Sequence, residues 1–251
     1  MTSGRREHYS YTYYADPTTA SRFDERRFGG PIGELVAADQ AAVLAGYVGP
    51  TAGRSILDIG TGTGRAAILL ARGGARVTGL DASEQMLAVA RQRAAQEHLA
   101  IDLVTGDAHA VAFPDRRFDV AISLRVLMHT PDWRRVIAEL CRVSRDRVVF
   151  DYPSARSAAL LQSMARAALH RLGGSTEPYR VFSDAAIDRA LAAAGFRVVA
   201  RHRQFVLPIA VHKAIGSRSF TAISERLLKR AGLLALAGSP VTLLAERCAR
   251  S

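Results

Sequence analysis

The chain has 251 residues, of which 49% are hydrophobic and 23% are charged, and its formal net charge is +11. This length favours one large domain with room for a small appendage, and the composition supplies enough apolar side chains for a core. Cys141 and Cys248 are too few for a disulfide framework, and the first residues are polar and aromatic where a signal segment would be apolar. Because no apolar run is long enough to cross a bilayer, we expect a soluble, cytoplasmic protein.

The positive charge comes almost entirely from arginines, with Lys213 and Lys229 as the lysines. A charge of this size is typical of proteins that bind nucleic acid or an anionic surface. The arginines are scattered, however, and no aromatic-and-basic nucleic-acid module is visible. The scattered arginines are therefore better explained by a compositional bias of the source genome. This argues against nucleic acid as a partner, while an RNA substrate stays as the alternative.

Strand-like and helix-like segments alternate through the middle of the chain. After residues 1–30, which are polar and aromatic, residues 32–47 have the apolar spacing of an amphipathic helix. Short apolar runs then predict strands at 55–59, 76–80, 101–104, 118–124 and 147–152. Between these strands, Gly73-Gly74 ends a helix, Ser83 caps the next one, and Thr130-Pro131-Asp132 starts another. This alternation predicts an α/β fold with a doubly wound parallel sheet.

The second half departs from this rhythm before it returns to it. Residues 154–182 carry a helical face followed by a loop rich in glycine, which we interpret as an insertion that can roof a site. The core is then predicted to close with a helix at 183–194, a strand at 196–207, a helix at 214–231 and a last strand at 240–247.

The most informative pattern is a glycine-rich turn between the first core strand and its helix. The strand runs into Gly60-Thr61-Gly62-Thr63-Gly64. Glycine lets a ligand approach the backbone closely, and the helix start offers unpaired N–H groups to it. Asp81 ends the next apolar run about 20 residues later, where an acid accepts hydrogen bonds from a ribose. The sequence therefore predicts a nucleoside-containing ligand at the carboxyl edge of the sheet.

The spacing of the glycines narrows the choice of nucleoside. A dinucleotide fingerprint requires Gly-x-Gly-x-x-Gly, but Arg65 follows Gly64, and the Gly-Lys-Ser/Thr of a P-loop is absent. A nicotinamide-dependent oxidoreductase is thereby disfavoured. Instead, Asp58-Ile-Gly-Thr-Gly-Thr-Gly64, Leu80-Asp-Ala-Ser-Glu-Gln-Met-Leu87 and Gly106-Asp-Ala108 follow in an order that resembles the class I S-adenosylmethionine-dependent methyltransferases. The likeness is greatest to the small-molecule branch with the ubiquinone and menaquinone biosynthesis methyltransferases, and it covers roughly residues 50–152.

The resemblance implies a particular architecture and cofactor. The fold would be a Rossmann-like, doubly wound, seven-stranded sheet whose last strand is antiparallel. Residues 1–48 would form an N-terminal helical cover, and residues 49–251 the methyltransferase core, with an inserted helical lid at about 154–182. The cofactor would be S-adenosylmethionine, which leaves as S-adenosylhomocysteine.

The resemblance also implies roles for individual residues. The loop glycines would lie against the methionyl part of the cofactor, Asp58 would orient the loop or reach the amine, and Asp81 would bind both ribose hydroxyls. Residues of the next segments would flank the adenine, meet its edge and lie beside the sulfonium. The candidate cofactor residues are Asp58, Gly60, Thr61, Gly62, Gly64, Asp81, Ala82, Met86, Asp107, Ala108, Ser123 and Leu124.

The candidate catalytic base is His129, in the segment that follows the fourth strand. Many relatives have Leu-Glu-His here, whereas this chain has Met128 in place of the glutamate, which puts a glutamate-assisted or metal-linked role in doubt. The alternative is that His129 shapes the wall of the pocket. No cluster of cysteine, histidine and aspartate has the spacing of a metal site, so we expect no metal.

The acceptor is predicted mainly by exclusion. The signatures of adenine, glutamine and protein arginine methylation are missing, which favours a small molecule. The insertion at 154–182 and the apolar region 205–223 indicate a greasy pocket, and hence an aromatic or isoprenoid-like acceptor, with O-methylation favoured over C- or N-methylation. A non-catalytic protein that binds S-adenosylmethionine stays as an alternative, and a homodimer and peripheral contact with a membrane are left open.

Overall fold

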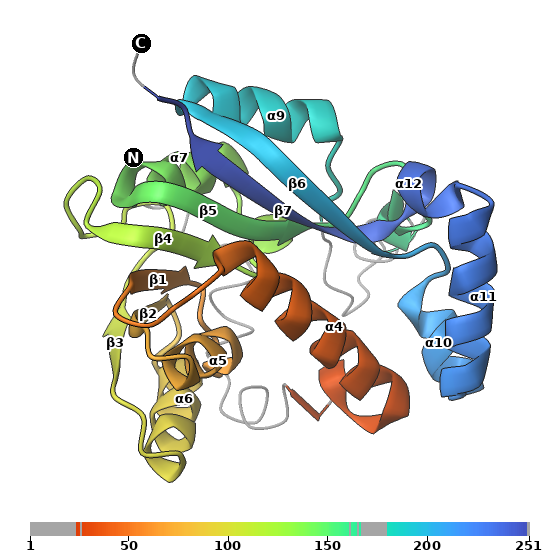
Figure 1. Cartoon of the computed structure of the whole chain (residues 1–251), viewed down its shortest axis with the longest axis horizontal. Coiled ribbons are helices and arrows are strands. Elements are labelled where there is room, and N and C mark those ends of the chain that lie inside the picture. Colours follow the sequence, from red (N-terminus) through yellow and green to blue (C-terminus); the bar gives the residue numbers. More distant parts are fainter. Residues whose placement is uncertain (1–23, 26, 161, 165, 167–179, 250–251) are drawn as a thin grey trace.

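The structure, a computed structural model, describes residues 24–25, 27–160, 162–164, 166 and 180–249. A seven-stranded sheet runs through the molecule in the order β3-β2-β1-β4-β5-β7-β6 (Figure 1). Its strands are β1 (Ser55–Ile59), β2 (Arg76–Asp81), β3 (Ile101–Thr105), β4 (Phe118–Ser123), β5 (Ser144–Tyr152), β6 (Phe196–Phe205) and β7 (Ser239–Arg247). β7 is antiparallel to both β5 and β6, while the first five strands are parallel. The predicted seven-stranded sheet with an antiparallel last strand is confirmed.

The central strands are short and apolar because they are buried on both faces, as parallel strands usually are. Every residue of β1 is buried, and the last four residues of β4 are buried as well. β1 pairs with β2 on one side and with β4 on the other. The strand order therefore reverses between β1 and β4, and ligands of doubly wound sheets bind outside the carboxyl ends of the strands at such a point.

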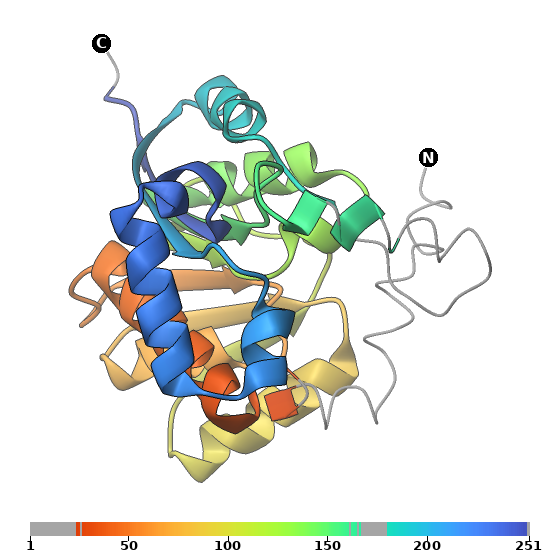
Figure 2. The same ribbon diagram turned by 90° about the vertical axis from the view of Figure 1, so that its right-hand side faces the viewer.

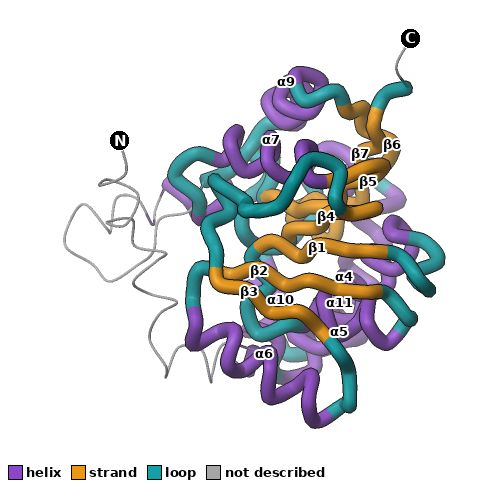
Figure 3. The backbone as a smooth tube through the Cα atoms, turned by 90° about the vertical axis from the view of Figure 1, so that its left-hand side faces the viewer, coloured by secondary structure: helices purple, strands orange, loops and turns teal. Residues whose placement is uncertain are grey.

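Helices cover both faces of the sheet. The described helices are α4 (Gly30–Val48), α5 (Arg65–Arg72), α6 (Glu84–Gln96), α7 (Trp133–Val143), α9 (Asp184–Ala193), α10 (Ile209–Ile215), α11 (Arg218–Arg230) and α12 (Leu233–Ala237), with a 3-10 turn η1 (Leu127–His129). α7 and α9 lie on one face of the sheet and α4 and α5 on the other (Figure 3), and their buried side chains belong to two separate apolar clusters. These two apolar layers hold the loops at the carboxyl ends of the strands in place.

The helices between β6 and β7 differ from the prediction. The helix expected at 214–231 is divided, because Gly216 takes a left-handed conformation at the end of α10 and the Ser217 hydroxyl accepts a hydrogen bond from Phe220 N in the first turn of α11. α12 was not predicted at all. Figure 2 shows α10 and α11 in blue beside α4, and α12 packs on α11.

The start of α7 also lies later than predicted. Asp132 caps this helix by accepting from Arg135 N at 3.2 Å. Thr130, the first residue of the predicted helix start, lies before this cap, and its hydroxyl donates to Leu127 O at 2.9 Å and closes η1. A 3-10 turn therefore separates the end of β4 from α7, and this turn carries His129.

The predicted cover and lid fall partly outside the described residues. Of the cover, residues 1–23 and 26 are not described, whereas α4 is, and it packs on α5 and β5. Of the lid, residues 161, 165 and 167–179 are not described. Both therefore stay predictions. Within the described part of the chain, no helix has the length and apolar character needed to cross a membrane.

Candidate functional site

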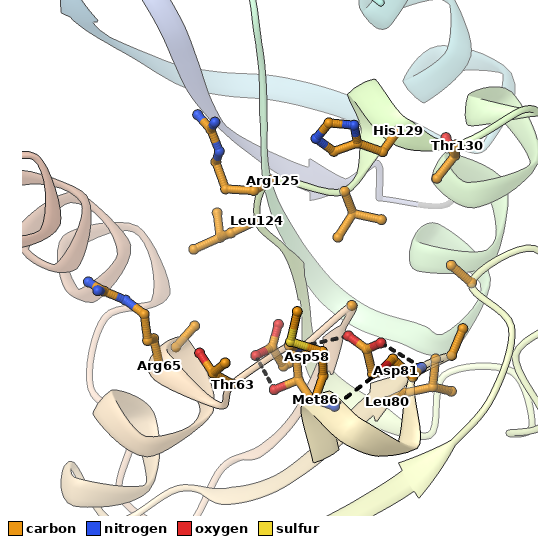
Figure 4. Close-up of a pocket in the computed structure, with 18 of the residues that line it drawn as sticks. Asp58, Thr63, Arg65, Leu80, Asp81, Met86, Leu124, Arg125, His129 and Thr130 are labelled. Carbon is orange, nitrogen blue, oxygen red and sulfur yellow. Dashed lines mark hydrogen bonds between the residues drawn. The ribbon is translucent and has the colours of Figure 1, made fainter. Parts of the chain in front are cut away.

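An open cleft of about 1180 Å³ lies at the carboxyl ends of β1, β2 and β4 (Figure 4). Its walls come from the loop after β1, the β2–α6 turn, the loop after β3, the segment from β4 to α7, and α4 with the residues before it. The lining residues are Arg27, Phe28, Gln40, Asp58, Gly60, Thr61, Gly62, Thr63, Arg65, Ala66, Leu80, Asp81, Ala82, Ser83, Met86, Gly106, Ala108, His109, Leu124, Arg125, Val126, His129, Thr130 and Pro131. This volume includes space that opens to the solvent.

The floor of the cleft is the glycine turn, in which two glycines have different tasks. Gly60 has a φ of +73°, and a Cβ added to it would lie 2.2 Å from Cγ2 of Val126. Gly62 has a φ of +55°, and an added Cβ would meet nothing within 4 Å. Glycine at position 60 thus lets the turn pack against the segment after β4, whereas at position 62 it leaves open space for a ligand.

The carboxylate of Asp81 joins the end of β2 to this turn. Its Oδ2 accepts from Gly62 N at 2.8 Å, and its Oδ1 accepts from Ser83 N at 2.9 Å. Burial raises the pKa of Asp81, while the backbone N–H groups of Ser83 and Gly62 oppose that rise. Each oxygen has a second lone pair, so the carboxylate can still accept from the two hydroxyls of a ribose.

Asp58 lies beneath the same turn and is almost completely buried, with 2% of its surface exposed. Its Oδ2 accepts from the Thr61 hydroxyl at 2.8 Å. Burial, together with the nearby charge of Asp81, raises the pKa of Asp58 to about 7. A cationic group bound above the turn would favour the ionised form of this carboxyl.

Most of the other predicted cofactor residues also line the cleft. Those that do are Thr61, Ala82, Met86, Ala108 and Leu124, in addition to Asp58, Gly60, Gly62 and Asp81. The structure therefore brings together, at one edge of the sheet, residues that the sequence separates by more than sixty positions. Around Asp58 and Asp81 the cleft offers apolar surface, open backbone and two carboxylates. These are the groups with which an adenosine can interact.

Gly64, Asp107 and Ser123 do not line the cleft. Asp107 Oδ1 accepts from His109 N at 2.8 Å and lies 2.7 Å from Nδ1 of the same histidine, so this carboxylate shapes its own loop. The Ser123 hydroxyl donates to Ile59 O at 2.9 Å and ties β4 to β1. The cofactor roles implied for these three residues stay predictions.

His129 reaches the cleft from η1, on the side opposite the glycine turn (Figure 4). It is 9% exposed, and its backbone N–H donates to Val126 O at 2.9 Å. His129 therefore faces the glycine turn across the open space of the cleft, and its catalytic role stays a prediction. The described residues hold no cluster of three or more His, Cys, Asp or Glu that fits a metal ion.

The sequence analysis missed the basic side chains of the cleft. Arg65 begins α5 and stacks on Phe28, with its Cζ 3.6 Å from the ring centroid. Arg125 directly follows the predicted Ser123-Leu124 pair and has a φ of +65°. Arg65 follows Gly64 and Arg125 follows Leu124, both of which are predicted cofactor residues. This adjacency is the one signal in the sequence that could have pointed to the two arginines. The apolar residues of 205–223, by contrast, do not line the cleft.

The fold and the cleft define a class of protein. The sheet order, the antiparallel last strand and the glycine turn at the switch point are those of the class I methyltransferase Rossmann-like fold. Residues 56–147 match the family model described as a methyltransferase domain, which confirms the resemblance seen in the sequence.

Among curated relatives, the chain is 36% identical over 97 residues to a demethylmenaquinone methyltransferase of Tropheryma whipplei, covering 38% of this chain and 39% of the relative. It is 38% identical over 96 residues to a ubiquinone biosynthesis O-methyltransferase of Thiobacillus denitrificans, covering 38% of this chain and 41% of the relative. The matched segment therefore spans about two fifths of these relatives.

Solved structures resemble the chain over most of its length. The magnesium protoporphyrin IX methyltransferase of Synechocystis PCC 6803, crystallised with bound S-adenosylhomocysteine, has a TM-score of 0.66 at 18% identity, over 95% of this chain and 98% of that one. A sarcosine dimethylglycine methyltransferase assigned in Galdieria sulphuraria has a TM-score of 0.64 at 18% identity, over 91% and 98%. At this identity the likeness establishes the fold.

Proposed function

We propose that this protein is an S-adenosylmethionine-dependent methyltransferase that modifies a small, partly apolar, aromatic or isoprenoid-like metabolite. The observation that carries the proposal is the position of Asp81, whose carboxylate faces the cleft beside the open backbone at Gly62. The match of residues 56–147 to a methyltransferase domain supports it. The cofactor proposed is S-adenosylmethionine, with S-adenosylhomocysteine as the product.

Different residues of the cleft would bind different parts of the cofactor. Asp81 would accept from the ribose hydroxyls, Ala82 and Met86 would pack against the base, and Asp58 would favour the cationic amine end. When bound, the cofactor supplies a methyl group that its sulfonium already activates. The protein then has to align the acceptor with that methyl group and exclude water, a task that positioning alone can perform.

We place the acceptor at the second end of the cleft, between Leu124 and His129. Leu124, Val126 and Pro131 offer apolar surface there. His129 is the residue that would take the proton of an acceptor hydroxyl, so we keep O-methylation as the favoured reaction. An assay with radiolabelled S-adenosylmethionine and a panel of phenols, aromatic acids and prenylated aromatics tests this. We expect label transfer to at least one aromatic hydroxyl compound, and loss of most of this activity in His129→Asn with unchanged cofactor affinity.

Calorimetry separates the rival functions. Heat on addition of S-adenosylhomocysteine without turnover of any acceptor would favour a non-catalytic binding protein. The net charge of +11 motivates RNA as a second candidate substrate, and tight, salt-dependent RNA binding would support it. A cytoplasmic location, a homodimer and peripheral contact with a membrane stay predictions.

A further inference from the structure

An apolar surface is exposed on the helices between β6 and β7. α10 and α12 both pack on α11, and the three helices lie together at one edge of the molecule (Figure 1). Ile223 and Leu227 of α11 are each 58% exposed, and Leu236 of α12 is 59% exposed. The exposed large apolar residues that define this helical surface are Val211, Ile215, Ile223, Leu227, Leu233 and Leu236. Single apolar residues are common on surfaces, whereas a group of this size on adjoining helices marks a contact site.

α11 is attached to the rest of the molecule through its opposite side. The buried Thr221 hydroxyl lies 3.0 Å from Nδ1 of His212. One turn further along, the Glu225 carboxylate accepts from two backbone N–H groups of the segment after β6. Ile223 and Leu227 each follow one of these two residues by two positions, which is about 200° around an α-helix, so they point away from the molecule.

Basic side chains lie among these apolar ones. Arg226, Lys229 and Arg230 are exposed, and none of them has an ion pair within the described part of the chain. Arg226 follows Ile223 by three positions, and Arg230 follows Leu227 by three. Side chains at this spacing are neighbours on a helix surface. The outward face of α11 is therefore both apolar and positively charged.

Acidic residues do not balance this charge. In the range 208–238, all of which the structure describes, Glu225 is the one acid. Its side chain is 12% exposed, and its carboxylate is hydrogen-bonded on the inner side of α11. The helical surface therefore favours a partner that combines negative charge with apolar material.

An anionic lipid bilayer has this combination. Amphipathic helices in a membrane interface bury apolar side chains at the acyl boundary and place Lys and Arg near the phosphate groups. A nucleic acid would attract the arginines, but its phosphate backbone offers nothing to the exposed leucines. A second copy of this chain would bring like charges together across a two-fold interface.

We propose that the helical surface binds a bilayer that contains anionic phospholipid. Ile223 and Leu227 enter the acyl boundary, and Arg226 and Arg230 bind lipid phosphates. This inference goes beyond the proposed function, because lipid binding requires neither the cofactor nor the acceptor. The surface also adjoins the cleft, since the Lys213 ammonium of α10 donates to the backbone O of Arg27, a cleft residue, at 2.9 Å. A bilayer there would suit a partly apolar acceptor.

Sedimentation with lipid vesicles tests the proposal. The wild type is mixed with vesicles of phosphatidylcholine alone, and with vesicles in which a third of the lipid is phosphatidylglycerol. We expect at least tenfold tighter binding to the anionic vesicles, and at least fivefold weaker binding when NaCl rises from about 0.1 M to about 0.5 M. Binding should be the same with and without S-adenosylhomocysteine.

Two variants locate the contact. Ile223→Gln with Leu227→Gln removes apolar side chains, and Arg226→Gln with Lys229→Gln and Arg230→Gln removes three charges. Each variant should bind anionic vesicles at least tenfold more weakly than the wild type. Because all five positions are exposed, both variants should keep the thermal unfolding midpoint of the wild type.

Matched controls make the same kinds of change elsewhere. Val104→Gln with Val199→Gln alters exposed apolar residues of the two edge strands. Arg76→Gln with Arg189→Gln and Arg197→Gln removes three exposed charges far from α11 in the sequence. Both controls should bind anionic vesicles within twofold of the wild type.

Several results would overturn the inference while leaving the proposed function intact. One is a wild type that does not bind anionic vesicles, or binds neutral ones equally well. Another is an equal loss in the three-charge control, which would assign binding to net charge. A third is a wild-type dimer in analytical ultracentrifugation that Ile223→Gln with Leu227→Gln makes monomeric, without vesicle binding, because the surface would then join two copies of the chain.

Discussion

At the scale of single residues, burial makes ionisation of the Asp58 carboxyl unfavourable. A carboxyl that is 2% exposed cannot ionise as readily as one in water, although the hydrogen bond that it accepts from Thr61 opposes part of this effect. Its pKa of about 7 means that the folded protein holds this proton at pH values where the unfolded chain has released it. Above this pH range the folded protein is therefore less stable than it would be with a neutral side chain at position 58.

This arrangement predicts a definite pH dependence. Because the folded pKa of Asp58 is raised above its unfolded value of 3.8, its contribution lowers the free energy of unfolding progressively as pH rises from about 4 to about 7. Asp58→Asn should equal the wild type near pH 4 and exceed it by about 1–3 kcal/mol at pH 8, an order-of-magnitude figure. Urea unfolding at both pH values measures this. A difference that does not grow with pH would contradict it.

Alanine substitutions at the two glycines of the turn should affect stability and binding differently. Gly62→Ala places a methyl group in open space at a φ of +55°, so it should cost about 1–2 kcal/mol of unfolding free energy. It should also weaken S-adenosylhomocysteine binding tenfold or more, because the methyl group occupies the ligand's space. Gly60→Ala should cost more stability, since its Cβ would lie 2.2 Å from Val126.

A matched double variant checks the cause of that larger loss. Adding Val126→Ala should restore part of the stability lost in Gly60→Ala, because it removes the atom that the new Cβ meets. Chemical denaturation of the four proteins gives the coupling between the two positions. Simple additivity of the two single effects would show that the contact with Val126 is not the reason.

At the scale of elements, a buried histidine joins α10 and α11 to the end of β6. His212 is fully buried, with Nε2 3.0 Å from Glu225 Oε1 and Nδ1 3.0 Å from the Thr221 hydroxyl. The Glu225 carboxylate also accepts from Val206 N at 2.8 Å and from Leu207 N at 3.0 Å. This network ties α10 and α11 to the segment that follows β6.

Removing the Glu225 carboxylate should therefore weaken the packing of α10 and α11 without affecting the cleft. Glu225→Ala should lower the free energy of unfolding by about 2–4 kcal/mol, because it leaves His212 and two backbone N–H groups without their acceptor. The exposed neighbour Arg226→Ala should change it by less than about 0.5 kcal/mol. Thermal unfolding and hydrogen exchange in α10 and α11 measure both. Affinity for S-adenosylhomocysteine should change less than twofold, and a larger change would contradict the separation.

The elements also show what the sequence can predict. The central strands were predicted well because parallel strands buried on both faces read as continuous apolar runs. β5 begins earlier than predicted, at Ser144. Its first residues, Ser144–Asp146, are polar, so the apolar pattern did not include them in the strand. The division at Gly216 and the helix α12 were missed, because nearby apolar residues continue the helical spacing and tertiary contacts decide where such a pattern stops.

At the scale of the whole molecule, the part of the cleft around Asp58 and Asp81 was predictable from the sequence, and the part around Arg125 was not. Asp58, Gly62 and Asp81 belong to short segments in which the residue order itself encodes a turn at the end of a strand. Arg27, before α4, and Arg125, after β4, are far apart in the sequence, and both line the cleft only in the folded chain. The left-handed turn at Arg125 has no local sequence signal, because it depends on the buried carboxyl of Asp151.

The central claim is that the carboxylate at the end of β2 binds the sugar of S-adenosylmethionine. Titration calorimetry with S-adenosylhomocysteine on the wild type, Asp81→Ala and Asp102→Ala tests it most directly, the last being an exposed carboxylate on the neighbouring strand. We expect heat for the wild type and for Asp102→Ala, and an affinity at least tenfold lower, about 1.4 kcal/mol, for a folded Asp81→Ala. Affinity of Asp81→Ala within twofold of the wild type, or no heat for the wild type, would contradict the account.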